Sequence, residues 1–112
     1  MNSLIKISNL KKSYNKNYNI DVLNRIDLTV NKGDIISIIG PSGSGKTTLL
    51  NVIGTLDNFD EGNYLFETTD ITTLKEKEKN LFRNKNIGFI HQFHYLIPEL
   101  TTIENIILPL LI

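Results

Sequence analysis

A glycine-rich run, GPSGSGKTT at positions 40–48, has the residue types and spacing of a phosphate-binding loop. Four residues separate Gly40 from Gly45, and Lys46 and Thr47 follow directly, which matches the P-loop pattern. Glycines adopt backbone angles closed to other residues and let main-chain amides approach phosphate oxygens at the start of a helix. We expect Lys46 to reach the β- and γ-phosphates and the Thr47 hydroxyl to bind Mg²⁺. The predicted nucleotide-binding residues of the loop are Gly40, Pro41, Ser42, Gly43, Ser44, Gly45, Lys46, Thr47 and Thr48.

The segments on either side of this loop have the patterns needed to position it. Residues 26–30 alternate apolar and polar side chains, as strands with one wet face do, and residues 4–7 do so more weakly. After a turn at residues 31–34, the run IISII at 35–39 predicts a parallel strand buried on both faces. Apolar residues then recur at helical spacing, which predicts a helix from near Lys46 to residues 54–57. Those apolar residues are Leu49, Leu50, Ile53 and Leu56.

The second half of the chain shows weaker patterns. Residues 62–68 predict a further strand, and residues 86–90 a second short buried strand. Residues 74–84 are rich in charge and predict a solvated helix that turns Leu74, Leu81 and Phe82 inward. A last helix is expected to begin near Thr102, because Thr101 and Glu104 have the spacing of a capping box.

Length and composition exclude several classes of protein. At 112 residues and 12.7 kDa the chain corresponds to one small domain. Twelve basic residues balance twelve acidic ones, so net charge gives no reason to expect nucleic acid as a partner. The chain contains no cysteine, and no run approaches the ~20 apolar residues that span a bilayer. We therefore expect a cytoplasmic protein that is able to attach peripherally to a membrane.

Two further motifs have a functional and a simpler interpretation. NKGD at positions 31–34 fits the guanine-binding N-K-x-D pattern of GTPases, but it precedes the phosphate loop and joins two predicted strands, which favours a turn. His91 and His94 are three residues apart and could form part of a metal site. No cysteine or carboxylate clusters with them in the sequence, so surface or packing histidines are the favoured interpretation.

Several stretches together resemble the ATP-binding subunits of ABC transporters. Residues 22–62 are similar to the usual sequence of that family through its P-loop. In NLKKSY, Tyr14 takes the place of the family aromatic that stacks on adenine, although an ordinary strand or turn aromatic is the alternative. In IGFIHQF, Gln92 matches the family glutamine that reaches Mg²⁺ and the attacking water. The resemblance therefore implies ATP and Mg²⁺ as ligands, with Thr47 and Gln92 at the metal and Gln92 in a catalytic role.

Residues 83–112 resemble, more narrowly, the subunits of lipoprotein-releasing systems. This resemblance implies ATP-driven release of lipoproteins from the inner membrane by two ATP-binding subunits, a homodimer within the complex, and two membrane-spanning permease subunits. It implies a peripheral location on the cytoplasmic face of the bacterial inner membrane, with residues 93–100 near the membrane partner. Macrolide-exporter and cell-division ABC subunits share much of the pattern and stay open as alternatives.

The resemblance covers essentially the whole chain and implies the α/β fold of P-loop NTPases, of the ABC ATPase type. Residues 1–112 would form the N-terminal part of the nucleotide-binding domain: an antiparallel β subdomain, part of a parallel-sheet core and the start of a helical subdomain. A parallel core with an open edge is expected to be marginally stable or to aggregate.

Several family elements do not occur in this sequence. They are the Leu-Ser-Gly-Gly-Gln signature, the Asp that ends an apolar strand, the adjacent catalytic Glu and the switch His. Phosphoryl transfer depends on positioning and electrostatic stabilisation, so we expect this chain alone to bind without turnover. Two alternatives follow: a truncated, non-hydrolysing ATP-binding remnant and a small P-loop kinase.

Overall fold

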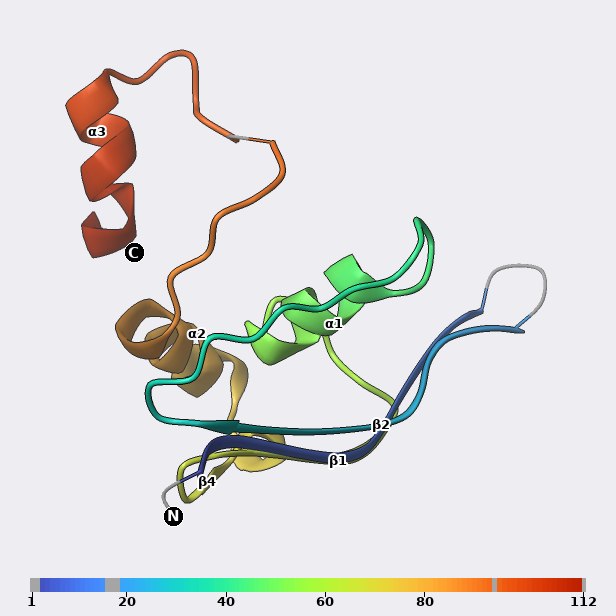
Figure 1. The fold of residues 1–112 in the computed structure, drawn as a ribbon. Helices are drawn as coiled ribbons and strands as arrows, with labels where there is room; N and C mark the ends of the chain where they lie inside the picture. Colours follow the sequence, from blue (N-terminus) through green and yellow to red (C-terminus); the bar gives the residue numbers. More distant parts are fainter. Residues whose placement is uncertain (1–2, 16–18, 94, 112) are drawn as a thin grey trace.

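The computed structural model describes residues 3–15, 19–93 and 95–111 and is organised around an antiparallel sheet. Its strands are β1 (Ser3–Asn15), β2 (Asn19–Asn31), β3 (Glu61–Phe66) and β4 (Thr69–Asp70), in the spatial order β2-β1-β3-β4. β1 pairs with both β2 and β3, so it forms the centre of the sheet (Figure 1). The strands predicted from residues 4–7, 26–30 and 62–68 are all confirmed.

A β-bulge in β1 decides which of its side chains face the core. The pairing of β1 with β2 shifts register between Ile7 and Leu10, and Asn9 has a positive φ of 52°. Ile5 and Ile7 are buried before the bulge, whereas Leu10 and Lys12 are buried after it. An extra residue in one strand reverses the inside-outside alternation beyond it, which explains the change from odd to even buried positions.

The helix that follows the glycine-rich loop packs on one face of the sheet. α1 (Lys46–Ile53) buries Leu49 and Val52, and these side chains join the core. The fully buried Tyr64 of β3 donates a hydrogen bond of 2.6 Å from its hydroxyl to the Ile53 carbonyl oxygen, while burial raises its pKa. The helix predicted to start at Lys46 is confirmed, although Leu50 and Leu56 remain about half exposed.

α2 is joined to the end of α1 by an arginine. A short 3-10 turn, η1 (Ile71–Thr73), leads into α2 (Glu76–Asn86), which lies on the same side of the sheet as α1 (Figure 1). The Arg83 guanidinium donates to the carbonyl oxygens of Gly54 at 3.2 Å and Thr55 at 2.6 Å. Carbonyl groups at the end of a helix lack partners within it, so Arg83 satisfies groups that α1 leaves unpaired.

The helix predicted over residues 74–84 forms as α2, two residues later, and one of its three predicted inward residues was wrong. Leu74, which precedes α2, and Phe82 pack against the core, and the Phe82 ring meets Phe66 edge-on with centroids 4.8 Å apart. Leu81, in contrast, is 59% exposed. Adjacent helical residues point about 100° apart, so a helix that directs Phe82 at the sheet turns Leu81 away from it.

The C-terminal part of the described chain extends away from the sheet (Figure 1). It consists of α3 (Thr102–Ile107) and η2 (Leu108–Leu111). The predicted capping box is confirmed, because the Thr101 hydroxyl accepts from the Glu104 amide and the Glu104 carboxylate accepts from the Thr101 amide. Hydrogen bonds from the Thr101 backbone amide and side chain lower the pKa of the Glu104 carboxyl. Asn84 of α2 donates to the Pro109 carbonyl oxygen at 2.7 Å.

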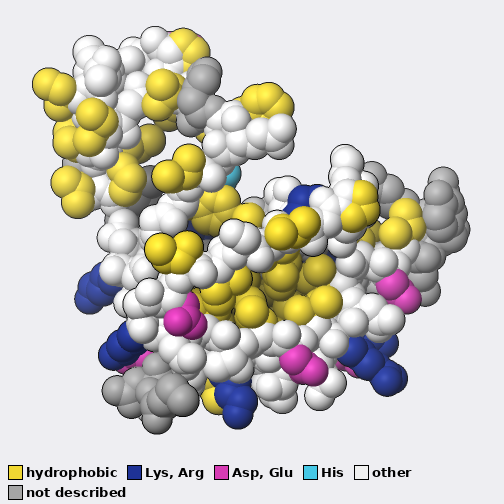
Figure 2. All heavy atoms as spheres, viewed as in Figure 1, with side chains coloured by type: hydrophobic (Ala, Val, Ile, Leu, Met, Phe, Trp, Pro, Cys, Tyr) yellow, Lys and Arg dark blue, Asp and Glu magenta, His cyan; other side chains and the backbone are white. Residues whose placement is uncertain are grey.

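The two predicted parallel strands are not formed. Of the strands predicted at residues 35–39 and 86–90, the first has no strand conformation, and in the second Asn86 is the last residue of α2 and residues 87–90 have no strand conformation. Ile35, Ile39 and Ile90 are 98%, 91% and 98% exposed. In the described part of the chain neither run has a neighbouring strand to pair with its amides and carbonyls, and a strand needs such a partner. Figure 2 shows hydrophobic side chains in the hollow beside the sheet and over the C-terminal segment.

No helix among the residues described is both long and apolar enough to pass through a bilayer.

Candidate functional site

The backbone of the glycine-rich loop requires glycine at two of its positions. Gly43 and Gly45 have φ angles of 82° and 96°, in the left-handed region that favours glycine. A Cβ on Gly45 would lie 2.8 Å from the Val22 carbonyl oxygen of β2. Gly45 also occupies the N-cap of α1, with no side chain capping the helix. The loop therefore approaches the sheet closely and leaves the first amides of α1 available to an anion.

The Lys46 side chain turns back into this loop. Its ammonium donates hydrogen bonds to the carbonyl oxygens of Gly40 and Pro41, the second at 2.7 Å, and lies 3.4 Å from the Ser44 hydroxyl. These bonds hold a positive charge at the inner side of the loop. Hydrogen bonds from an ammonium to anionic oxygens are stronger than those to neutral carbonyls, so a phosphate entering the loop would compete effectively for this group.

One cleft brings most of the predicted nucleotide-binding residues together. It has a volume of about 480 Å³ and includes the start of α1, one residue of β2 and Gln92 from a distant segment. Its lining residues are Val22, Ser42, Gly43, Gly45, Lys46, Thr47, Thr48 and Gln92. Gly40, Pro41 and Ser44 surround the Lys46 ammonium without lining the cleft. The fold thus places Gln92 beside the loop, although 46 positions separate it from Lys46 in the numbering.

The donor set of this cleft fits Mg²⁺ in the presence of phosphate. Thr47 contributes a hydroxyl oxygen and Gln92 an amide oxygen, and both residues line the cleft. Mg²⁺ prefers oxygen ligands and is commonly bound through one or two protein groups together with substrate phosphates and water. The absence of Cβ atoms at Gly43 and Gly45 leaves the main chain accessible to those phosphates.

Tyr14 lies outside the residues that line this cleft. It is near the end of β1, is 38% exposed, and donates a hydrogen bond of 2.9 Å from its hydroxyl to the Asp57 carboxylate. Lys12 forms an ion pair with the other oxygen of Asp57 at 2.9 Å. Burial opposes the charge of Asp57, but hydrogen bonds from Lys12, Tyr14 and the Asn58 amide outweigh it and lower the pKa of this carboxyl.

Lys12 and Asp57 were not among the residues predicted from the sequence. The sequence contains a pattern that could have identified Lys12. Leu10, Lys12 and Tyr14 are spaced two residues apart, so in a strand they share one face. Only the bulge before Leu10 makes that face the inner one. No local signal identifies Asp57, which lies in the turn after α1.

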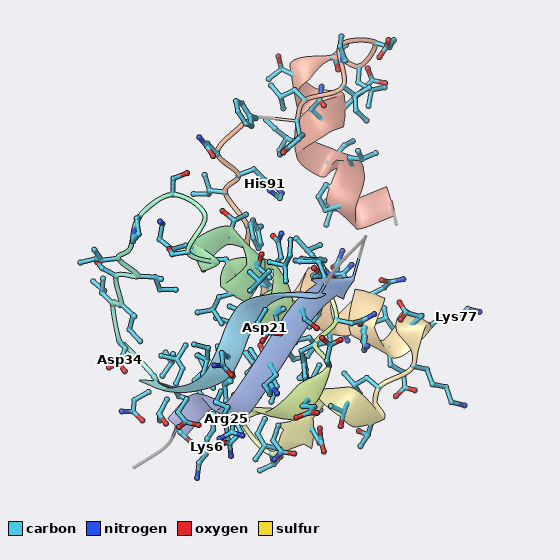
Figure 3. All side chains as sticks on the ribbon, turned by 90° about the vertical axis from the view of Figure 1, so that its right-hand side faces the viewer. Lys6, Asp21, Arg25, Asp34, Lys77 and His91 are labelled. Carbon is cyan, nitrogen blue, oxygen red and sulfur yellow. The ribbon has the colours of Figure 1, made fainter. Side chains whose placement is uncertain are left out.

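The two motifs with alternative interpretations have simple structural roles among the described residues. Asn31 and Asp34 close a turn, with hydrogen bonds of 3.1 Å from the Asp34 amide and 2.7 Å to the Asp34 carboxylate. The turn interpretation of NKGD is therefore confirmed. His91 stacks on Phe89 with ring centroids 4.6 Å apart, at the base of the extended segment that leads to α3 (Figure 3). This contact agrees with a packing histidine, while His94 lies outside the described residues.

The sequence profile of the ABC transporter family matches residues 23–109, which include the glycine-rich loop, α1 and Gln92. The chain belongs to the ABC transporter family. A curated relative from Bacteroides thetaiotaomicron, named lipoprotein-releasing system ATP-binding protein LolD, is 51% identical over 106 residues, which cover 95% of this chain and 47% of the relative. LolD of Aquifex aeolicus is 47% identical and matches 99% of this chain and 48% of its own length. This ABC-family chain thus spans about half the length of the curated relatives it matches.

Solved structures of ATP-binding cassettes have the same fold over the described part of this ABC-family chain. The dimeric bacterial ABC transporter cassette MJ0796 matches 96% of the chain with a TM-score of 0.89 and 41% identity. A post-hydrolysis state of that cassette, dimeric and bound to ADP and Pi, matches with the same TM-score and 40% identity. In each case the match covers 47% of the solved chain. The expected P-loop ATPase fold, present in part, is therefore confirmed.

Proposed function

We propose that residues 1–112 are the N-terminal part of a nucleotide-binding domain that binds MgATP and serves an ABC transporter of the lipoprotein-releasing type. The observation that carries this proposal is the cleft in which the glycine-rich loop, Lys46 and Gln92 lie together. The names of the relatives from Bacteroides thetaiotaomicron and Aquifex aeolicus support lipoprotein release as the transported process. The ADP and Pi bound to the similar cassette support an adenine nucleotide as the ligand.

The proposed binding mode follows from the chemistry of each part of the cleft. The amides of residues 43–48 and the positive end of α1 bind the phosphate oxygens. Lys46 exchanges its contacts with loop carbonyls for the β- and γ-phosphates. Thr47 and Gln92 would hold Mg²⁺, which would neutralise phosphate charge, and Gln92 would also orient a water toward the γ-phosphate. Tyr14 provides a ring on which the adenine stacks.

We expect this chain alone to bind the nucleotide without turning it over. The residues that line the described cleft include neither a carboxylate nor an imidazole that could orient and deprotonate a water. The Gln92 amide can orient a water but cannot accept its proton, and we expect phosphoryl transfer without a base in position to be slow. Hydrolysis is therefore proposed to need further groups, which a complete subunit of this family would supply.

The proposed partners are a second ATP-binding subunit and membrane-spanning permease subunits, at the cytoplasmic face of the inner membrane. The dimeric state of the similar cassette supports the first. Exposed apolar side chains after Gln92 support the second, because such patches commonly mark protein contacts. Phe93 is 65% exposed, Ile103 of α3 is 70% exposed and Leu110 is 82% exposed.

A calorimetric titration with MgATP tests the proposed site. Lys46→Ala should abolish tight binding, because it removes the only ammonium that lines the cleft in the described part of the chain. Lys6→Ala is a matched control, since Lys6 is exposed on β1, between the inward Ile5 and Ile7, and lies far from the loop (Figure 3). Equal affinity of the Lys46→Ala variant and the unmodified chain would refute the site assignment.

A further inference from the structure

Lys12, Tyr14 and Asp57 form a cluster at the end of β1, here called the Tyr14 anchor. One oxygen of the Asp57 carboxylate accepts from the Lys12 ammonium at 2.9 Å, and the other accepts from the Tyr14 hydroxyl at 2.9 Å. The Lys12 side chain is only 10% exposed, and that of Asp57 is 32% exposed. The Lys12–Asp57 bond is partly buried and the Tyr14–Asp57 bond is exposed. Both are charge-assisted, and such hydrogen bonds are stronger than those between neutral groups.

The Tyr14 anchor also fixes the environment of the aromatic ring. The Lys12 ammonium lies over the Tyr14 ring, 5.1 Å from its centroid, within the range of a cation–π contact. Tyr14 is nevertheless 38% exposed, so part of its surface remains open to a ligand. Asp57 accepts the hydrogen bond of the Tyr14 hydroxyl, and Lys12 contacts the ring. Together these two contacts restrict the orientation of the Tyr14 ring.

The Tyr14 anchor is joined to the phosphate-binding loop through α1 and the two long strands. Asp57 lies in the turn that follows α1, while Gly45 and Lys46 lie at the start of the same helix. Gly45 approaches Val22 and Leu23 of β2, and Leu23 is the ladder partner of Lys12 on β1. The amide of Asp57 donates to the Asn51 carbonyl oxygen of α1 at 3.2 Å. One short helix and one strand pair therefore set the position of both the loop and the ring.

We propose that Asp57 and Lys12 are positioning residues that hold the Tyr14 ring in place for the base of the nucleotide. This proposal rests on the proposed function, in which Tyr14 stacks on adenine. A tyrosine free to rotate loses conformational entropy when it binds a base, and an anchored ring has already lost most of it on folding. The Tyr14 anchor should therefore favour ligands with a base over ligands made only of phosphate.

The test compares the affinity for MgATP with that for magnesium triphosphate, measured by calorimetry on the full chain. Tyr14→Phe keeps the ring and removes the hydroxyl that Asp57 accepts from, so it disturbs the anchor with little effect on folding. We expect it to weaken MgATP about threefold to tenfold and to leave the triphosphate affinity unchanged. Asp57→Ala should produce a similar or larger loss, again confined to the ligand with a base.

A double variant sharpens this test. If the hydroxyl–carboxylate bond is the interaction that matters, adding Tyr14→Phe to Asp57→Ala should weaken MgATP no further than Asp57→Ala alone. Glu61→Ala is the matched control, because it removes a carboxylate from the same sheet whose 4.0 Å ion pair with Lys11 is exposed and does not involve Tyr14. Its ratio of the two affinities should equal that of the unmodified chain.

The outcomes separate this proposal from the proposed function. A third variant, Tyr14→Ala, removes the ring itself and should weaken MgATP without much effect on the triphosphate. If Tyr14→Ala loses the preference for MgATP while Tyr14→Phe and Asp57→Ala keep the affinity ratio of the unmodified chain, the positioning role is overturned and base stacking is left intact. An unchanged ratio in all three variants would overturn base stacking and the positioning role together. Equal losses for both ligands in Tyr14→Phe would assign the anchor to general stability and overturn its role at the base.

Discussion

The antiparallel sheet and the two apolar runs at residues 35–39 and 87–90 both contain isoleucines, but only those of the sheet are buried in a core. Ile7 and Leu10 of β1 are 1% and 0% exposed, whereas Ile35 and Ile90 are both 98% exposed. β1 has hydrogen-bonded neighbours on both sides, and α1 covers its inner face. Residues 35–39 and 87–90 have no such neighbour in the described part of the chain. Burial of an apolar residue therefore depends on a partner for its backbone as well as on its side chain.

The largest effect is expected from a cavity in the packed region. Leu10→Ala should lower the free energy of unfolding by about 2–5 kcal/mol, because Leu10 is fully buried at the centre of the sheet. Ile35→Ala should change it by no more than about 0.5 kcal/mol, since almost all of Ile35 is already in contact with solvent. Urea unfolding followed by circular dichroism measures both values. Similar losses for the two variants would show that Ile35 is buried in solution.

A second, intermediate effect concerns association of the chain with itself. Ile35, Ile39 and Ile90 expose enough apolar surface that we expect the purified chain to associate or aggregate. Replacing all three with threonine should lower the associated fraction seen by sedimentation velocity and leave the far-ultraviolet circular dichroism of the sheet unchanged. An unmodified chain that stays monodisperse and melts cooperatively as a monomer would contradict this prediction.

The smallest effect is a pH dependence at the edge of the packed region. The pKa of Asp57 is lowered on folding from its usual value of 3.8, so the charged carboxylate stabilises the fold. This contribution is fully present above the unfolded pKa and is lost as the pH falls through the folded pKa. Asp57→Asn should therefore cost about 1 kcal/mol near neutral pH, where it breaks a partly buried ion pair.

The pH experiment compares melting temperatures of Asp57→Asn and the unmodified chain. The difference should be constant at neutral and weakly acidic pH and should shrink below about pH 4, as the Asp57 carboxyl is protonated first in the unfolded chain and then, at still lower pH, in the folded chain. Glu61→Ala serves as a control, because the Lys11–Glu61 pair is exposed. A difference that grows as the pH falls would contradict the lowered pKa.

Patterns that depend on neighbouring residues in sequence were predicted well. The start of α1 at Lys46 and the Thr101–Glu104 capping box both follow from local chemistry. The alternation of β2 and the turn at residues 31–34 are equally local. Predictions that required a partner distant in sequence were less successful. The runs at 35–39 and 87–90 have the composition of buried strands, but composition cannot supply the strand with which they would pair.

The sequence by itself determined the identity and order of the groups that we propose bind phosphate, since Gly40, Gly45, Lys46 and Thr47 follow one another at a spacing that the backbone fixes locally. Only the tertiary structure decided which side chains join them. It brought Gln92 to the loop, and the bulge at Asn9 turned Lys12 inward to meet Asp57 from the far end of α1. The physical reason is that a β-bulge and the pairing of distant strands both change which face of the sheet a side chain occupies. Neither can be recognised from the periodicity of the sequence.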